Sequence, residues 1–198
     1  MRVKLQLVMC SDDGQEETIT DLVTLQKDAQ RIEHLGLTLR EAKQLLNTLQ
    51  QCMLQHQVEA FLEASATCPD CGTPLKAKGS HTRTLRTLFG TFKLASPRLF
   101  LCPCQRRKTT TFRPLTSLLP ASVAPELLFM ETKWASLVSY GLTVDALTDF
   151  LPLEVTLDIK TVRHDTLKIA ERCEAELGEE QGSFIEGCPR GRVPPGCG

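Results

Sequence analysis

The sequence has few aromatic residues and no long apolar segment. Its 198 residues include one Trp and one Tyr. No run of about 18 apolar residues occurs, which excludes a predicted membrane-spanning helix. The first residues, MRVKL, lack the apolar core of a signal peptide. We therefore expect a cytoplasmic protein without a membrane partner.

Excess charge of one sign is also lacking, because the formal net charge of the chain is −1. The positive charge is local, however. Residues 68–113 contain ten Lys and Arg and one Asp, a net charge of +9, whereas the segments before and after carry −4 and −6. A basic block between acidic flanks is typical of a phosphate-binding face, although a solvated hairpin without a partner is the alternative. The predicted DNA-binding residues of this block are Lys76, Lys78, Arg83, Arg86, Lys93, Arg98, Arg106, Arg107 and Lys108.

Cysteine, by contrast, is abundant. Nine cysteines are present, and an odd number in a reducing compartment indicates metal binding rather than disulfides. Cys68 and Cys71 form a C-x-x-C-G motif, and Cys102 and Cys104 form a C-x-C motif. Two such turns meeting across a hairpin can hold one tetrahedral ion, so we predict a zinc ribbon with a structural Zn²⁺. The alternatives are two unrelated pairs or a thioredoxin-like redox motif, but no helical pattern follows the C-x-x-C.

Two hairpins and a long helix are predicted in the first half of the chain. Residues 3–9 and 18–25 alternate or are β-branched, and residues 82–89 and 91–101 read as strands joined at Gly90. Thr38 and Glu41 form a capping box, from which an amphipathic helix runs to about Ser65. Core packing is the expected role of this helix, and pairing between two copies is the alternative.

Three helices are predicted after a Pro-rich connection, over residues 125–140, 144–151 and 159–177. Gly141 is expected to end the first, and Thr143 to cap the second. This arrangement is typical of a helix-turn-helix, although trihelical bundles without DNA also have it. The predicted DNA-binding residues of the last helix are Lys160, Thr161, Arg163, His164 and Lys168.

The predicted fold is therefore α+β in four regions. These are an N-terminal β-hairpin with a long helix (1–66), a zinc ribbon (67–113), a helix-turn-helix-like unit (114–177) and a disordered tail (178–198). The tail is rich in Gly and Pro, which cannot build a core.

Five strings of the sequence resemble the N-terminal part of bacterial Kra-type insertion-sequence transposases. They are residues 1–7 (MRVKLQL), 30–37 (QRIEHLGL), 86–91 (RTLFGT), 131–141 (ETKWASLVSYG) and 184–190 (FIEGCPR). The resemblance implies a DNA-binding region with a zinc ribbon and a helix-turn-helix, followed in the family by an RNase H-like nuclease with three metal-binding acidic residues. The chain ends at Gly198, where that nuclease would begin, and its last eight residues do not continue the family's pattern. We expect a truncated or frame-shifted product.

No catalysis is therefore expected from this chain. An RNase H-like site needs carboxylates on a mixed sheet to hold paired metal ions, and no strand-rich segment follows Leu101. We interpret Asp145, Asp149, Asp158 and Asp165 as cap and surface residues.

The first functional hypothesis is a zinc-dependent, nucleoid-associated module that binds DNA at element ends, without a small-molecule substrate. The second is an interaction module that forms homodimers or pairs with intact transposase as an inhibitor. The third is a free-standing transcription regulator.

Overall fold

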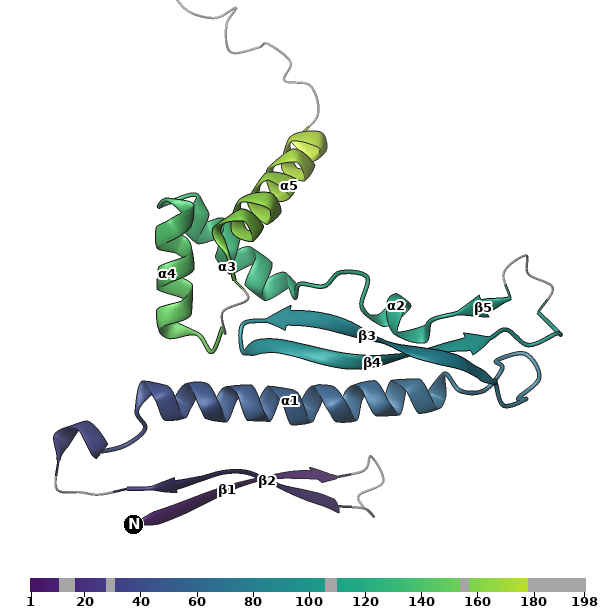
Figure 1. Cartoon of the computed structure of the whole chain (residues 1–198), viewed down its shortest axis with the longest axis horizontal. Helices are drawn as coiled ribbons and strands as arrows, with labels where there is room; N and C mark the ends of the chain where they lie inside the picture. Colours follow the sequence, from purple (N-terminus) through teal and green to yellow (C-terminus); the bar gives the residue numbers. More distant parts are fainter. Residues whose placement is uncertain (11–16, 28–30, 106–109, 154–156, 178–198) are drawn as a thin grey trace, which may run out of the picture.

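The computed structural model describes residues 1–10, 17–27, 31–105, 110–153 and 157–177 (Figure 1). These residues form a two-stranded sheet, a three-stranded sheet and five α-helices, which confirms the predicted α+β class. The predicted disordered tail lies outside the described residues. None of the described helices combines the length and the apolar character needed to cross a bilayer.

The N-terminal hairpin is present as predicted. Its strands are β1 (Arg2–Cys10) and β2 (Glu17–Gln26), which pair antiparallel with an irregularity after Leu5. Alternation along β1 turns every second side chain toward the interior, and Val23 and Leu25 of β2 are buried. The connection between the two strands, residues 11–16, lies outside the described residues. A 3₁₀ turn, η1 (Ile32–His34), follows the hairpin.

Helix α1 (Leu39–Ala64) lies between the two sheets and contacts both β2 and β4 (Figure 1). The capping box is confirmed, because the Glu41 N–H donates to the Thr38 hydroxyl over 3.3 Å and the Thr38 N–H donates to the Glu41 carboxylate over 2.9 Å. The apolar residues of this helix differ in burial. Val58 is the buried residue of α1, whereas Met53 is exposed.

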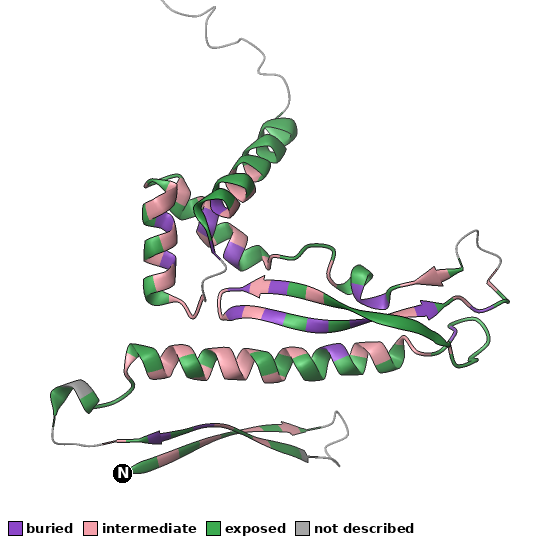
Figure 2. Cartoon of the chain, in the orientation of Figure 1, coloured by how far each residue is buried: buried purple, intermediate pink, exposed green. Residues whose placement is uncertain are grey.

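The second sheet has the order β3-β4-β5. Its strands are β3 (Ala77–Thr87), β4 (Gly90–Phe100) and β5 (Thr111–Phe112), and the short helix α2 (Pro114–Leu118) follows. The sequence did not predict β5 or α2. One hydrophobic cluster joins this sheet to α1 and α2 (Figure 2), and its buried members are Val58, Leu85, Phe92, Leu94 and Leu115.

The turn between β3 and β4 requires a glycine. Gly90 has a φ of 135°, and a Cβ there would lie 2.2 Å from Nδ2 of Asn47. That amide nitrogen donates to the Phe89 carbonyl over 2.8 Å. Gly90 thus lets α1 approach the hairpin turn closely.

The C-terminal unit consists of three mutually contacting helices. They are α3 (Pro125–Ala135), α4 (Tyr140–Phe150) and α5 (Ile159–Leu177). The predicted bounds of the last helix are confirmed, but the predicted end of the first at Gly141 is wrong. Helix α3 ends at Ala135, and Ser139 rather than Thr143 caps α4, because its hydroxyl accepts from the Leu142 N–H. A separate hydrophobic cluster holds these helices, with Leu147, Leu157 and Val162 buried.

Arg86 of β3 joins the sheet to the C-terminal helices. Its backbone N–H donates to the Ser122 carbonyl over 2.8 Å, and its backbone carbonyl accepts from the Ala124 N–H over 2.7 Å. Its guanidinium Nη2 lies 2.8 Å from the Asp165 carboxylate on α5. Figure 1 shows α3, α4 and α5 gathered near the turn of the β3–β4 hairpin.

Candidate metal centre and basic surface

The first two cysteines lie in a tight turn after α1. The Cys68 N–H donates to the Thr73 carbonyl, and the Gly72 N–H donates to the Cys68 carbonyl, both over 2.9 Å. Gly72 has a φ of 69°, the left-handed conformation expected for the glycine of the C-x-x-C-G motif. A bridge between Thr67 and Pro74 closes the base of the turn. These bonds direct two sulfurs to the same side.

The second pair lies directly after β4. The Gln105 N–H donates to the Cys102 carbonyl over 2.9 Å, which forms a turn containing Cys102 and Cys104. The Phe100 N–H donates to the Lys76 carbonyl over 2.8 Å and holds the end of β4 beside the chain that leaves the first turn. The hairpin thereby returns the second cysteine pair to the first.

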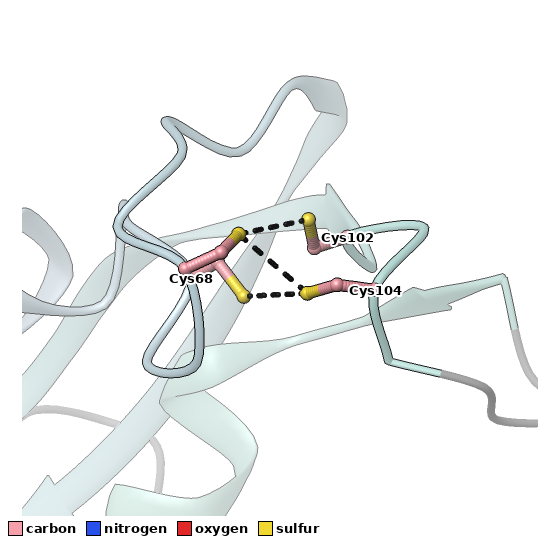
Figure 3. A group of neighbouring side chains, drawn as sticks. Cys68, Cys102 and Cys104 are labelled. Atoms are coloured by element: carbon pink, nitrogen blue, oxygen red, sulfur yellow. Dashed lines mark hydrogen bonds between the residues drawn. The ribbon is translucent and has the colours of Figure 1, made fainter.

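The four cysteine sulfurs form one cluster, and all of them lie within 4.8 Å of one another. The Cys68 and Cys104 sulfurs are 3.4 Å apart, and the Cys71 sulfur lies 3.5 Å from those of Cys102 and Cys104. Figure 3 shows the sulfurs of the two arms facing one another. Sulfurs around a tetrahedral ion with bonds of about 2.3 Å would be about 3.8 Å apart, so this cluster could hold a metal ion. The alternative of two unrelated pairs is wrong.

The thiols of the cluster influence one another's protonation. Hydrogen bonds with the hydroxyl and backbone of Thr73 lower the pKa of the Cys71 thiol to about 6. Hydrogen bonds with Cys102 and Cys68 raise the pKa of the Cys104 thiol, because a second thiolate beside the first is unfavourable. A bound cation would relieve this repulsion, since metal coordination deprotonates thiols.

Burial divides the four ligands into two kinds. Cys68 and Cys102 are buried, whereas Cys71 and Cys104 are exposed. All four ligand positions come from protein sulfurs, which is typical of a structural centre rather than a catalytic one with an open position. After Cys71 the chain forms a turn and enters β3 rather than a helix. This arrangement lacks the helix N-terminus that activates a redox cysteine.

The predicted DNA-binding residues of the basic segment 68–113 differ in how far they are exposed. Lys76, Lys78 and Lys93 are exposed, and the Lys78 Nζ lies 5.4 Å from the centre of the Phe100 ring. Arg98 is half-buried and donates from Nε to the Thr111 hydroxyl over 2.8 Å. Arg83 is also half-buried. The predicted residues Arg106, Arg107 and Lys108 lie outside the described residues.

The predicted contact residues of the last helix lie on the N-terminal half of α5. Lys160, Arg163, His164 and Lys168 are exposed. Thr161 is half-buried, and its N–H donates to the Asp158 carboxylate over 2.6 Å. The interpretation of Asp158 as a cap is therefore confirmed.

Arg86 and Asp165 differ from their sequence interpretations. We predicted that Arg86 contacts DNA and that Asp165 lies on the surface, but the two pair with each other and retain 15% and 14% of their side-chain exposure. Glu131 on α3 is completely buried, and its carboxylate lies 3.8 Å from Nη1 of Arg86. Burial raises the pKa of Glu131 to about 7, against the lowering effect of Arg86. The remaining two aspartates, Asp145 and Asp149, are exposed as expected.

The sequence did not indicate this cluster of Arg86, Glu131 and Asp165. Its members are 79 residues apart at the extremes, and no motif spacing links them. Glu131 gave no distinct signal either, because α3 also contains Glu126 and Lys133, and a Glu in such a helix fits a surface position.

Comparisons with protein-family models, with curated protein sequences and with solved structures find no match for this chain. The resemblance to Kra-type transposases therefore remains a prediction from the sequence strings.

Proposed function

We propose that the chain is a zinc-dependent DNA-binding module of the transposase type, which recognises element ends and has no nuclease site of its own. The observation that carries the proposal is the four-cysteine cluster at the base of a hairpin whose segment has a net charge of +9. A metal at this base would fix the hairpin and with it the positions of Lys76, Lys78 and Lys93.

Zinc is the ion that fits the cluster best. Four thiolates are soft ligands, and Zn²⁺ accepts tetrahedral sulfur coordination without redox chemistry. Cys68, Cys71, Cys102 and Cys104 would hold it, and its contribution would be to stabilise the fold.

The electrostatic argument concerns phosphate contacts. Exposed Lys side chains on the hairpin and on α5 can displace counterions condensed on DNA, so affinity should fall steeply with salt. Recognition of bases by the exposed residues of α5, such as Arg163, is the helix-turn-helix part of the proposal.

The test is fluorescence anisotropy with a labelled DNA duplex of about 30 base pairs at about 50 to 200 mM salt. We expect binding that weakens steeply with salt and is lost with chelator. The variant Lys78→Gln/Lys93→Gln should bind more weakly, whereas Lys133→Gln, an exposed lysine on α3, serves as the matched control. Affinity that does not change with salt would contradict the proposal. Incubation with Mg²⁺ and supercoiled DNA should produce no nicking.

A protein-interaction module is the second candidate function. An apolar cavity of about 480 Å³ favours it, lined by residues of the N-terminal hairpin and of the segment after it, among them Val3, Leu5, Leu25, Leu35 and Leu37. Sedimentation of the wild type and of the Lys78→Gln/Lys93→Gln variant would distinguish the two functions, because dimers formed through this face would survive loss of the basic residues.

A further inference from the structure

One cleft brings together basic residues that are far apart in the sequence. It has a volume of about 960 Å³, and both β3 and α5 line it. Arg83 comes from β3, and His164 and Lys168 come from α5. We propose that this cleft binds a single backbone phosphate of DNA, held jointly by the hairpin and the last helix. The inference rests on the proposed DNA-binding function and identifies where one strand of the DNA is held.

The fold places these side chains on one side of α5. Residues 161, 164, 168 and 172 follow one another at spacings of three or four, so they share a face of the helix, and all four line the cleft. The pair between Arg86 and Asp165 attaches that same face to β3. Arg83 of the same strand also lines the cleft. The junction of the two units thus creates the site.

The basic side chains of the cleft fall into two groups. Arg86 forms an ion pair with Asp165, and Arg172 forms one with Glu176, whose carboxylate lies 3.4 Å from the Arg172 Nε. Within the described residues, Arg83, His164 and Lys168 take part in no ion pair. The buried Nε of Arg83 also has no hydrogen-bond partner there. Two permanent cations and an imidazole therefore remain for an anion.

The chemistry of these groups fits a phosphate. A guanidinium presents a planar fork of donors to phosphate oxygens, and an ammonium adds a compact charge. Glu171 also lines the cleft and opposes an anion there. Its neutralisation should therefore strengthen binding, whereas loss of Lys168 should weaken it.

The experiment measures the salt dependence of DNA binding for Arg83→Met, Lys168→Met, the double variant and Glu171→Gln, with Lys133→Met as the control. The zinc-loaded full chain and a labelled duplex of about 30 base pairs are used. We expect each single basic variant to bind about 3- to 10-fold more weakly and to lower the slope of log affinity against log salt by up to about 0.9. The double variant should lower the slope by no more than about 0.9 in total, because both cations contact one phosphate. Glu171→Gln should bind more tightly.

Three results would contradict a shared phosphate site in the cleft. The first is additive losses of affinity with a slope change of about 1.8 in the double variant, which would mean that the two cations contact separate phosphates. The second is wild-type affinity of the basic variants, and the third is unchanged affinity of Glu171→Gln. Lys168 is exposed, so its variant remains informative even if Arg83→Met alters the fold. Wild-type protein that binds no DNA would instead refute the proposed function itself.

Discussion

Cys68 is the ligand of the sulfur cluster that is most enclosed by the protein, with 2% of its surface exposed. Cys68→Ser should abolish stoichiometric zinc and lower the free energy of unfolding by more than about 4 kcal/mol, because loss of a structural metal is among the largest single-residue effects. Elemental analysis and chemical denaturation measure the two quantities. Cys173→Ser, an exposed cysteine on α5, is the control and should retain both zinc and stability. Equal zinc contents in the two variants would contradict the four-cysteine site.

Glu131 makes stability depend on pH in an unusual direction. Its pKa is about 7 in the folded protein, above the ordinary value of 4.5, because burial disfavours the carboxylate more than Arg86 favours it. Between these values the folded state binds more protons than the unfolded state, so stability falls as pH rises from about 4.5 to about 7. Asp165 adds to the effect through its own negative charge.

Glu131→Gln should remove this dependence. At pH 8 the variant is expected to be more stable than the wild type by about 1 to 3 kcal/mol, and at pH 4 nearly equal to it. Denaturation curves with saturating zinc, recorded for both proteins across this range, measure the difference. Glu126→Gln, on the exposed first turn of α3, controls for a general charge effect. Parallel pH profiles for Glu131→Gln and the wild type would contradict the assignment.

The sequence predicted the cysteine cluster but not the buried charges, and the reason is physical. Metal ligands need short, fixed spacings, so Cys68 and Cys71 are visible as a motif. An ion pair such as Arg86 with Asp165 requires only that two elements meet in space, and local sequence carries no trace of that. The net charge of the basic segment was therefore correct as a count, but it included an arginine that the fold uses internally.

The capping box fixes the start of α1 and also ties the helix to the N-terminal hairpin. Lys27, which follows β2, forms an ion pair with Glu41, and this contact together with the Thr38 bonds lowers the pKa of Glu41 to about 2. Thr38→Ala should destabilise the protein by about 1 kcal/mol, the usual cost of losing an N-cap. Thr48→Ala is the control, because its hydroxyl bonds within the helix to the Gln44 carbonyl and caps nothing. Equal unfolding free energies for the two variants would contradict a capping role.

Helix boundaries were predictable where a cap residue had no competitor nearby. Thr38 stands alone before α1, whereas Ser139 and Thr143 are both plausible caps before α4. Ser139 is the N-cap of α4 because α3 ends at Ala135, and Tyr140 can therefore be the first residue of the next helix. The core face of α1 was harder to predict, since sheets on two sides contact the helix and no single apolar stripe is required.

The described molecule has two separate hydrophobic clusters, and the proposed metal site belongs to only one of them. Leu115 is buried in the cluster of α1, α2 and the second sheet, whereas Leu147 is buried in the cluster of α3, α4 and α5. The first cysteine pair precedes β3 and the second follows β4, so both lie at the open end of the hairpin. The three helices lie near the opposite end, at the turn between the strands (Figure 1). The metal should therefore stabilise the first cluster and affect the second through the Arg86 junction and through the bond of 2.7 Å that Lys43 Nζ on α1 donates to the Thr148 carbonyl on α4.

Chelation should separate the two units. Without zinc, amide hydrogen exchange is expected to increase in β3 and β4, whereas Val162 and its neighbours in α5 should keep most of their protection, because stability varies between cooperative regions of one chain.

Leu147→Ala should instead increase exchange in the helical unit and leave β3 and β4 protected, because it lowers the stability of that unit by about 2 to 5 kcal/mol. Arg86→Met should weaken the coupling and make the two responses more independent. If chelator raises exchange equally in α5 and β4, the clusters unfold as one unit and the junction carries more energy than its few contacts imply.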